Sequence, residues 1–206
     1  MRDGAMTPSG DVERRKSSPD RGFKWAAAIA AASLVGFVIF VIVRGSPHPA
    51  PIGTGALKVP PPPVLKAGGV APAFSLPDLH GGDLVSLSAF RGMPVIVNFF
   101  ASWCPDCRAE LAAVATVARK NSGRLAVIGV DSNETSDAAA SSLLAAAGAV
   151  YPVAVDASAT VASKYLVQAL PVSYFLDSSG RVVGAALGPQ SASSLERWVA
   201  RLGVHR

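Results

Sequence analysis

The sequence is poor in the residues that build metal sites and disulfide frameworks. Its 206 residues include two cysteines and three histidines. Two cysteines are too few for a disulfide-stapled small domain or for a four-cysteine zinc site. Of the histidines, His48 falls in a proline-rich stretch and His205 at the C-terminus, so only His80 remains as a nearby ligand. We therefore expect neither a bound metal nor another cofactor.

Charge is also scarce, at 16% of the residues, while half of the chain is hydrophobic, so the chain as a whole is not disordered. Residues 1–24 carry six basic and four acidic side chains, residues 25–67 carry three basic and no acidic ones, and residues 68–206 carry ten of each. The net charge of +5 therefore lies outside the part that can fold. A domain without a basic surplus is not expected to bind nucleic acid.

The longest uncharged hydrophobic run covers residues 25–43. As a helix it would span about 28 Å, close to the thickness of the hydrocarbon core of a bilayer. A buried helix of a soluble domain and a cleaved signal peptide are the alternatives. A signal peptide usually has a shorter apolar region that ends in small residues, whereas Arg-Gly-Ser-Pro follows here at residues 44–47. The run predicts a single-pass signal anchor in the lipid bilayer.

The flanking charges predict the orientation of this anchor. Five basic side chains lie within residues 14–24, whereas Arg44 is the one basic residue close to the other end. Because positive charge stays on the cytoplasmic side, residues 1–24 are expected to be a cytoplasmic tail, with the rest of the chain outside the cytoplasm at the cell membrane.

Residues 44–67 are rich in proline, with four consecutive prolines at 60–63. This density favours an extended, semi-rigid linker and supports no core. A proline-rich docking ligand is the alternative interpretation.

The length allows one domain of ordinary size in addition to these segments, and we place it at residues 68–206. Apolar, β-rich runs alternate there with helical patterns. The turn sequence Asp-Ser-Ser-Gly at residues 177–180 predicts an antiparallel hairpin near the end of the domain. The pattern predicts an α/β fold with a central mixed β-sheet flanked by helices. The expected strands are residues 94–100, 125–130, 153–155, 172–176 and 182–186, and the expected helices are residues 104–120, 136–147, 159–165 and 193–202.

Both cysteines, Cys104 and Cys107, lie where a buried strand passes into a helix. Residues at positions i and i+3 of a helix are neighbours, close enough for a reversible disulfide. The positive end of the helix stabilises a thiolate on Cys104, and thiolate is the species that attacks a disulfide. Cys107, one turn further on, would resolve the mixed disulfide. Pro105 suits the first turn of such a helix.

Two other uses of this cysteine pair compete with redox catalysis. A zinc or copper site would need further ligands, and His48, His80 and His205 are the only histidines in the chain. A static disulfide between adjacent helical turns closes a very small loop and so contributes little to stability. Redox catalysis is the favoured interpretation.

With these motifs in place, residues 70–203 resemble the thioredoxin superfamily, and within it the TlpA/ResA-like membrane-anchored thiol–disulfide oxidoreductases. The resemblance rests on Phe-Ser-Leu-Pro-Asp at residues 74–78, on Val-Asn-Phe-Phe-Ala-Ser-Trp-Cys-Pro-Asp-Cys-Arg-Ala-Glu-Leu at residues 97–111, and on Ala-Leu-Pro-Val-Ser-Tyr-Phe-Leu-Asp at residues 169–177. It implies a thioredoxin fold for residues 68–206 and thiol–disulfide oxidoreductase activity without a cofactor.

The resemblance also implies roles around the cysteines. The proline that matches Pro171 is cis in the family and lies beside them, and the backbone before it, at Leu170, pairs with an extended substrate segment; an ordinary loop proline is the alternative. Asn98 stands where ordinary thioredoxins have a buried aspartate, and the family's candidate proton acceptor matches Glu110. A solvated acid in the first turn of the helix is an equally good interpretation of Glu110.

Two further side chains flank or separate the cysteines. Asp106 lies between them, and its negative charge disfavours the thiolate and stabilises the disulfide, which predicts a reductant. A plain exposed loop acid is the less favoured alternative. Trp103 is expected on the rim that faces the substrate, with structural packing as the alternative.

The expected function is a membrane-tethered enzyme that reduces disulfides of exported client proteins. In the family, typical clients belong to cytochrome c maturation, and a membrane thiol-electron donor supplies the electrons. A disulfide-forming oxidase is the main alternative. A peroxiredoxin-type peroxidase would have threonine three residues before the reactive cysteine, where this chain has Ala101. A non-enzymatic chaperone with this fold is the remaining alternative.

Overall fold

The computed structural model describes residues 60–204. The predicted cytoplasmic tail at 1–24, the predicted anchor at 25–43 and residues 44–59 of the predicted linker lie outside the described residues. Within the part that is described, no helix combines the length and the hydropathy needed to cross a bilayer.

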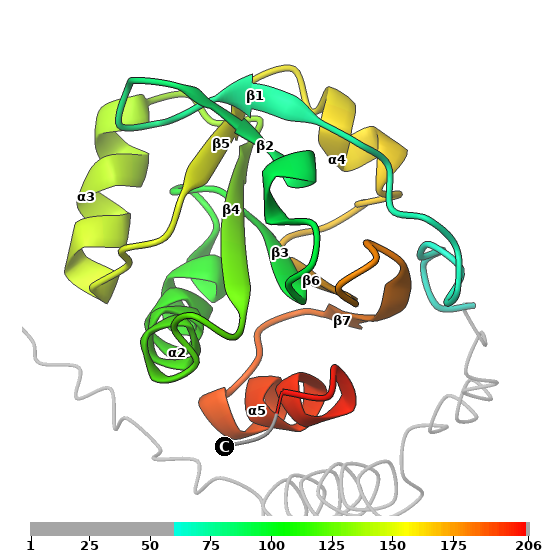
Figure 1. The fold of residues 1–206 in the computed structure, drawn as a ribbon. Coiled ribbons are helices and arrows are strands. Elements are labelled where there is room, and N and C mark those ends of the chain that lie inside the picture. The colour runs from blue at the N-terminus through cyan, green and yellow to red at the C-terminus, as the bar shows by residue number, and fades with distance from the viewer. Residues whose placement is uncertain (1–59, 205–206) are drawn as a thin grey trace, which may run out of the picture. The chain divides into compact units, whose positions relative to one another are not determined.

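The centre of the domain is a mixed sheet (Figure 1). Its strands are β3 (Val95–Phe100), β4 (Ala126–Ser132), β5 (Val153–Asp156), β6 (Val172–Leu176) and β7 (Val182–Leu187). They lie in the order β5-β4-β3-β6-β7. β3 and β5 run parallel to β4, whereas β6 is antiparallel to both β3 and β7. The predicted mixed α/β sheet and the predicted hairpin near the end of the domain are confirmed.

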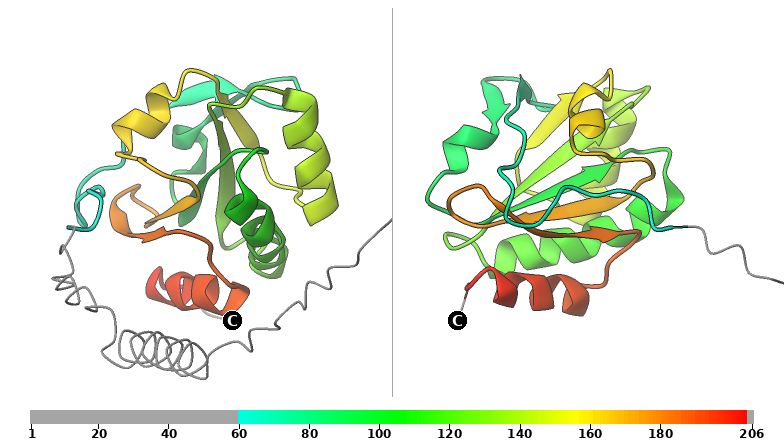
Figure 2. Two further views of the ribbon diagram at one scale, coloured as in Figure 1. Left: turned by 180° about the vertical axis from the view of Figure 1, so that it is seen from behind. Right: turned by 90° about the vertical axis from the view of Figure 1, so that its right-hand side faces the viewer.

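Helices cover both faces of this sheet. They are η1 (Leu87–Phe90, a 3-10 turn), α2 (Pro105–Lys120), α3 (Asp137–Ala147), α4 (Thr160–Lys164) and α5 (Ala192–Arg201). Alternate residues of β3 point to opposite sides, as they must in a strand. Ile96 and Phe100 pack with α2, α3 and α5, whereas Val97 and Phe99 pack with α4 and the segment before β3. Figure 2 shows α2 and α5 together below the sheet.

An aromatic cluster fills the second face. Phe99 of β3 and Tyr174 of β6 both contact the ring of Tyr165, with centroid distances of 5.1 and 5.3 Å, and Phe74 lies against the same ring at 6.2 Å. The Tyr165 hydroxyl donates a hydrogen bond of 2.8 Å to the carbonyl of Pro72. This cluster therefore fixes the chain that enters the domain against the central strands.

The structure adds elements that the sequence patterns did not indicate. β1 (Ser75–Pro77) and β2 (Leu84–Ser86) form a small antiparallel hairpin, and η1 follows it. β4 also continues two residues beyond the predicted end, through Asp131 and Ser132, which are buried although they are polar. The expected helices are all present, with ends within one residue of the predicted ones.

Candidate active site

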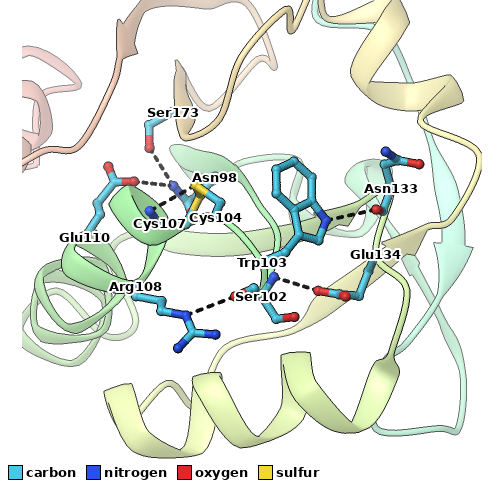
Figure 3. Close-up of a disulfide and its surroundings, with 10 residues drawn as sticks. All are labelled: Asn98, Ser102, Trp103, Cys104, Cys107, Arg108, Glu110, Asn133, Glu134 and Ser173. Carbon is cyan, nitrogen blue, oxygen red and sulfur yellow. Dashed lines mark hydrogen bonds between the residues drawn. A yellow bond between two sulfur atoms is a disulfide. The ribbon is translucent and has the colours of Figure 1, made fainter.

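The two cysteines occupy the turn between β3 and the first turn of α2. Cys104 is the N-cap residue of the helix, and its Sγ accepts a hydrogen bond of 3.1 Å from the backbone N–H of Cys107. The two sulfurs form a disulfide, with the Cα atoms 5.3 Å apart (Figure 3). Pro105 takes the first helical position, where the missing N–H costs nothing. Cys104 is 4% exposed and Cys107 is fully buried, so Cys104 is the more accessible of the two.

The capping position gives Cys104 its chemical character. The first N–H groups of a helix have no partner inside the helix and carry a partial positive charge. A sulfur that accepts one of these N–H groups is stabilised more as a thiolate than as a thiol. After reduction, the same position would therefore favour the ionised form of Cys104.

The loop before β6 lies at the same end of the sheet as the disulfide. β6 runs antiparallel to β3, with Val172 opposite Phe99, so β6 begins where β3 ends. The Leu170–Pro171 peptide bond is cis, as predicted. Leu170 packs against the buried cluster that contains both cysteines, and the carbonyl of Pro171 accepts a 3.0 Å hydrogen bond from the N–H of Gly188.

Glu110 is buried on the inner side of α2, one turn after Cys107. It is 1% exposed, and its Oε2 accepts a hydrogen bond of 3.2 Å from Nδ2 of Asn98. The same Asn98 nitrogen donates to the hydroxyl of Ser173 at 3.0 Å. The interpretation of Glu110 as a solvated acid of the first turn is therefore wrong, because Glu110 lies in the second turn of α2 and its side chain points toward β3 and β6 rather than toward water.

Burial raises the pKa of Glu110 from the ordinary 4.5 to about 7, and hydrogen bonds from Asn98, the backbone of Gln190 and Ser173 oppose the shift only in part. Among the described residues, Oε1 of Glu110 has no hydrogen-bond partner. Of the two oxygens of this carboxyl group, Oε1 is therefore the one that is not engaged by a described residue.

A second buried carboxyl, Asp131, lies at the end of β4, beside Phe100 in the register of the sheet. Burial, followed by the charges of Glu134 and Asp137, raises the pKa of Asp131 to about 7. Neither carboxyl oxygen has a partner within residues 60–204. Sequence patterns gave no sign of this residue, because the apolar run of the strand ends one residue earlier.

The loop after β4 holds the residues that precede Cys104 (Figure 3). Oε2 of Glu134 accepts a hydrogen bond of 2.6 Å from the N–H of Ser102, and the carbonyl of Asn133 accepts one of 3.1 Å from the indole N–H of Trp103. On the other side, Nε of Arg108 donates to the carbonyl of Ser102 at 3.0 Å. The side chains of Glu134 and Arg108 thus bind the backbone N–H and the carbonyl of Ser102, respectively. The sequence patterns predicted no role for either side chain.

Trp103 and Asp106 lie on the outside of the site. The Trp103 side chain is 52% exposed although its indole N–H is bonded, so it forms part of the rim around the disulfide. Asp106 is exposed in the first turn of α2 and lines a cavity together with Leu170 and Pro171. Within residues 60–204 no group of three or more histidine, cysteine, aspartate or glutamate side chains is arranged to hold a metal ion.

Comparison with known proteins identifies the family. Residues 67–185 match the sequence profile described as the AhpC/TSA family. This match covers more than half of the chain. The chain belongs to this family. It is a thiol–disulfide oxidoreductase of the ResA and DsbE type with a thioredoxin-like fold.

The chain is similar to several named oxidoreductases. It is 30% identical over 139 residues to the thiol-disulfide oxidoreductase ResA of Bacillus thuringiensis (strain Al Hakam), covering 67% of this chain and 79% of the relative. It is 28% identical over 137 residues to ResA of Bacillus subtilis (strain 168), covering 66% and 75%. A crystal structure of a putative thiol:disulfide interchange protein DsbE from Chlorobium tepidum matches with a TM-score of 0.61 at 29% identity, over 67% of this chain and 98% of that one.

The first prediction concerns the effect of Glu110 on stability. The folded protein keeps the Glu110 proton up to about pH 7, whereas the unfolded chain loses it near pH 4.5. The free energy of unfolding should therefore fall as the pH rises from 4.5 to 7, by up to about 3 kcal/mol from this residue. Denaturant unfolding of the Glu110→Gln variant at pH 5 and pH 8 should show a smaller fall than the wild type.

Asp131→Asn serves as the second arm of this experiment. The pKa of Asp131 is also raised to about 7, so the Asp131→Asn variant should also show a smaller fall in the free energy of unfolding between pH 5 and pH 8 than the wild type. The double variant should show a smaller fall than either single variant. A Glu110→Gln variant that keeps the full pH dependence of the wild type would contradict the assignment of a protonated, buried Glu110.

Proposed function

We propose that Cys104 and Cys107 are the redox pair of a membrane-tethered reductase that acts outside the cytoplasm. The observation that carries the proposal is the position of the Cys104 sulfur, which caps α2 at the end of the sheet where the cis Leu170–Pro171 loop also lies. A reactive thiolate beside a loop that can pair with an extended chain is the arrangement that disulfide exchange with a protein client requires.

The reaction begins with the reduced enzyme. The Cys104 thiolate attacks one sulfur of the client disulfide, forms a mixed disulfide, and expels the other client sulfur as a thiolate. Cys107 then loses its proton and attacks Sγ of Cys104, which releases the second client sulfur. Two electrons have passed to the client, and the enzyme is left with the Cys104–Cys107 disulfide, the form that the structure contains.

Glu110 is the proposed acceptor for the Cys107 proton. It lies three residues after Cys107 on α2, so the two side chains share one face of the helix. Its pKa of about 7 lets it be ionised before the step and protonated after it at neutral pH. Asn98 keeps Oε2 bonded, so Oε1 is the oxygen that remains to receive the proton.

The direction of electron flow is proposed from Asp106. Its exposed carboxylate, between the two cysteines, disfavours a neighbouring thiolate and therefore stabilises the disulfide relative to the dithiol. An enzyme with a stable disulfide gives electrons to its clients. The competing oxidase requires the opposite, a stable dithiol.

The proposed location is the cell membrane, with residues 25–43 as the anchor and residues 1–24 in the cytoplasm. The support is the length of the uncharged run and the excess of basic residues before it. Exported proteins that contain disulfides, including those of cytochrome c maturation, are the proposed clients. A membrane thiol donor would return electrons to the Cys104–Cys107 disulfide after each cycle.

Trapping tests the client reaction. The Cys107→Ser variant lacks the resolving sulfur, so it should accumulate mixed disulfides with its clients through Cys104 in cells that express it at normal levels. Non-reducing gels followed by mass spectrometry would detect them. The matched control, Cys104→Ser, should trap nothing. The proposal fails if the two variants give the same band pattern, and a double variant that retained full activity would point to a chaperone instead.

The reduction potential tests the direction. A reductase should have a potential near that of thioredoxin, about −270 mV, whereas an oxidase would lie near −120 mV. Asp106→Asn removes the charge that disfavours the thiolate, so its potential should rise by about 10–20 mV. Equilibration with glutathione or dithiothreitol buffers gives both values. A wild-type potential at the oxidising end, or a fall in the variant, would overturn the proposed direction.

A further inference from the structure

A cavity of about 250 Å³ lies beside the disulfide, and one wall comes from an unexpected part of the chain. Asp106, Leu170 and Pro171 line it on the side of the cysteines. Pro62 and Pro63, from the run of four prolines that the sequence suggests is only a spacer, line it as well. The predicted linker therefore extends to the edge of the site.

Contacts with the domain hold this proline segment in place. The N–H of Leu65 donates a hydrogen bond of 3.3 Å to the hydroxyl of Tyr174, and the Leu65 side chain packs against the aromatic face of the core. Three residues further on, the chain pairs with the start of β7, because the N–H of Gly68 donates to the carbonyl of Val182 at 2.8 Å and the N–H of Val182 donates to the carbonyl of Gly69 at 2.9 Å. Figure 2 shows the segment, in cyan, beside the strands of the hairpin.

The chemistry of the cavity indicates its occupant. Leu166 and Leu187, both large and exposed, lie in its lining with the prolines, and Asp106 is the one charged side chain among the lining residues. Asp106 lies between the two cysteines in the sequence and lines this cavity, and Leu170, also in the lining, packs against the buried cluster that contains both cysteines, so the cavity borders the site where a client sulfur would react. The occupant is therefore the client segment that flanks the reacting cysteine.

Proline is well suited to such a wall. It has no backbone N–H, so Pro62 and Pro63 cannot donate backbone hydrogen bonds to the client as a strand residue would, and full strand pairing of the client is left to the loop at Leu170. Their fixed φ angles also keep the wall in place before the client arrives, which lowers the entropy cost of binding. The wall thus contributes apolar contact without adding backbone N–H donors that would compete for the client's carbonyl groups.

We propose that Pro62 and Pro63 form part of the client-binding groove, and that the groove selects an extended segment with an apolar side chain and a cationic side chain next to its cysteine. This inference rests on the proposed disulfide exchange at Cys104. In this proposal, the end of the predicted linker helps to select the client and also attaches the domain.

The probes for a test are short peptides with one cysteine, joined in a mixed disulfide to thionitrobenzoate. The Cys104 thiolate attacks the peptide sulfur and expels the coloured thionitrobenzoate, and Cys107 then releases the peptide as a thiol while the enzyme becomes a disulfide. Three peptides differ only in the two residues next to the cysteine. The first peptide has leucine and lysine there, the second has glycine and lysine, and the third has leucine and glutamate. The reactions use the reduced, full-length protein in mild detergent. For each protein variant, the rate with each peptide is divided by the rate of the same variant with the symmetrical nitrobenzoate disulfide, which carries no peptide.

The wild type should prefer leucine over glycine, and lysine over glutamate, each by about fivefold. Pro62→Gly/Pro63→Gly should reduce the leucine preference by about threefold. The matched control is Pro60→Gly/Pro61→Gly, which makes the same change in the same run outside the cavity lining and should keep the wild-type preference. Asp106→Asn should bring the lysine preference close to one.

The outcomes separate this inference from the proposed function. Wild-type protein that reacts with no peptide disulfide overturns the proposed exchange itself. Peptide reactions whose leucine preference is the same in the wild type and in Pro62→Gly/Pro63→Gly overturn the groove alone, as does an equal loss in both double-glycine variants. A lysine preference that survives in Asp106→Asn overturns the cationic part of the selection.

Discussion

The hydrogen bond between Sγ of Cys104 and the N–H of Cys107 is the interaction on which the rest of the site depends. It makes the sulfur the cap of α2, so one atom completes the helix and is also the proposed nucleophile. Helix N-termini need a polar acceptor at this position, and most proteins supply an oxygen there. Because a thiolate accepts this bond better than a thiol does, formation of the helix and activation of Cys104 have the same physical cause.

Around this bond the protein separates two environments. On the inner side, Glu110 and Asn98 are enclosed between α2 and the sheet, and burial keeps the Glu110 proton available near neutral pH. On the outer side, Trp103 and Asp106 are exposed, on the side where the client is proposed to bind. The proposed proton transfer and the proposed client binding thus occur on opposite sides of the N-terminal part of α2, which lets this helix serve both while Glu110 stays buried.

Much of the domain could be predicted from the sequence because its strands are short apolar runs and its helices end in recognisable caps. The Cys-Pro-Asp-Cys turn and the cis bond at Pro171 followed from position and resemblance. The β1–β2 hairpin did not, because three-residue strands with exposed positions have no periodicity to detect. The hydrogen bond that the Ser102 N–H donates to Glu134 joins residues 32 positions apart and depends on the loop conformation. The position of Pro62 depends on the hydrogen bond between Leu65 and Tyr174. Such long-range contacts leave no local pattern.

Selective alkylation of the reduced full-length protein tests the central claim most directly. Iodoacetamide reacts with thiolates, and peptide mass mapping gives the labelling rate of each cysteine separately. If the α2 cap ionises one sulfur, Cys104 should be labelled at pH 7 at least about tenfold faster than Cys107. Labelling of Cys107 first, or of both cysteines at the same rate, would contradict the account.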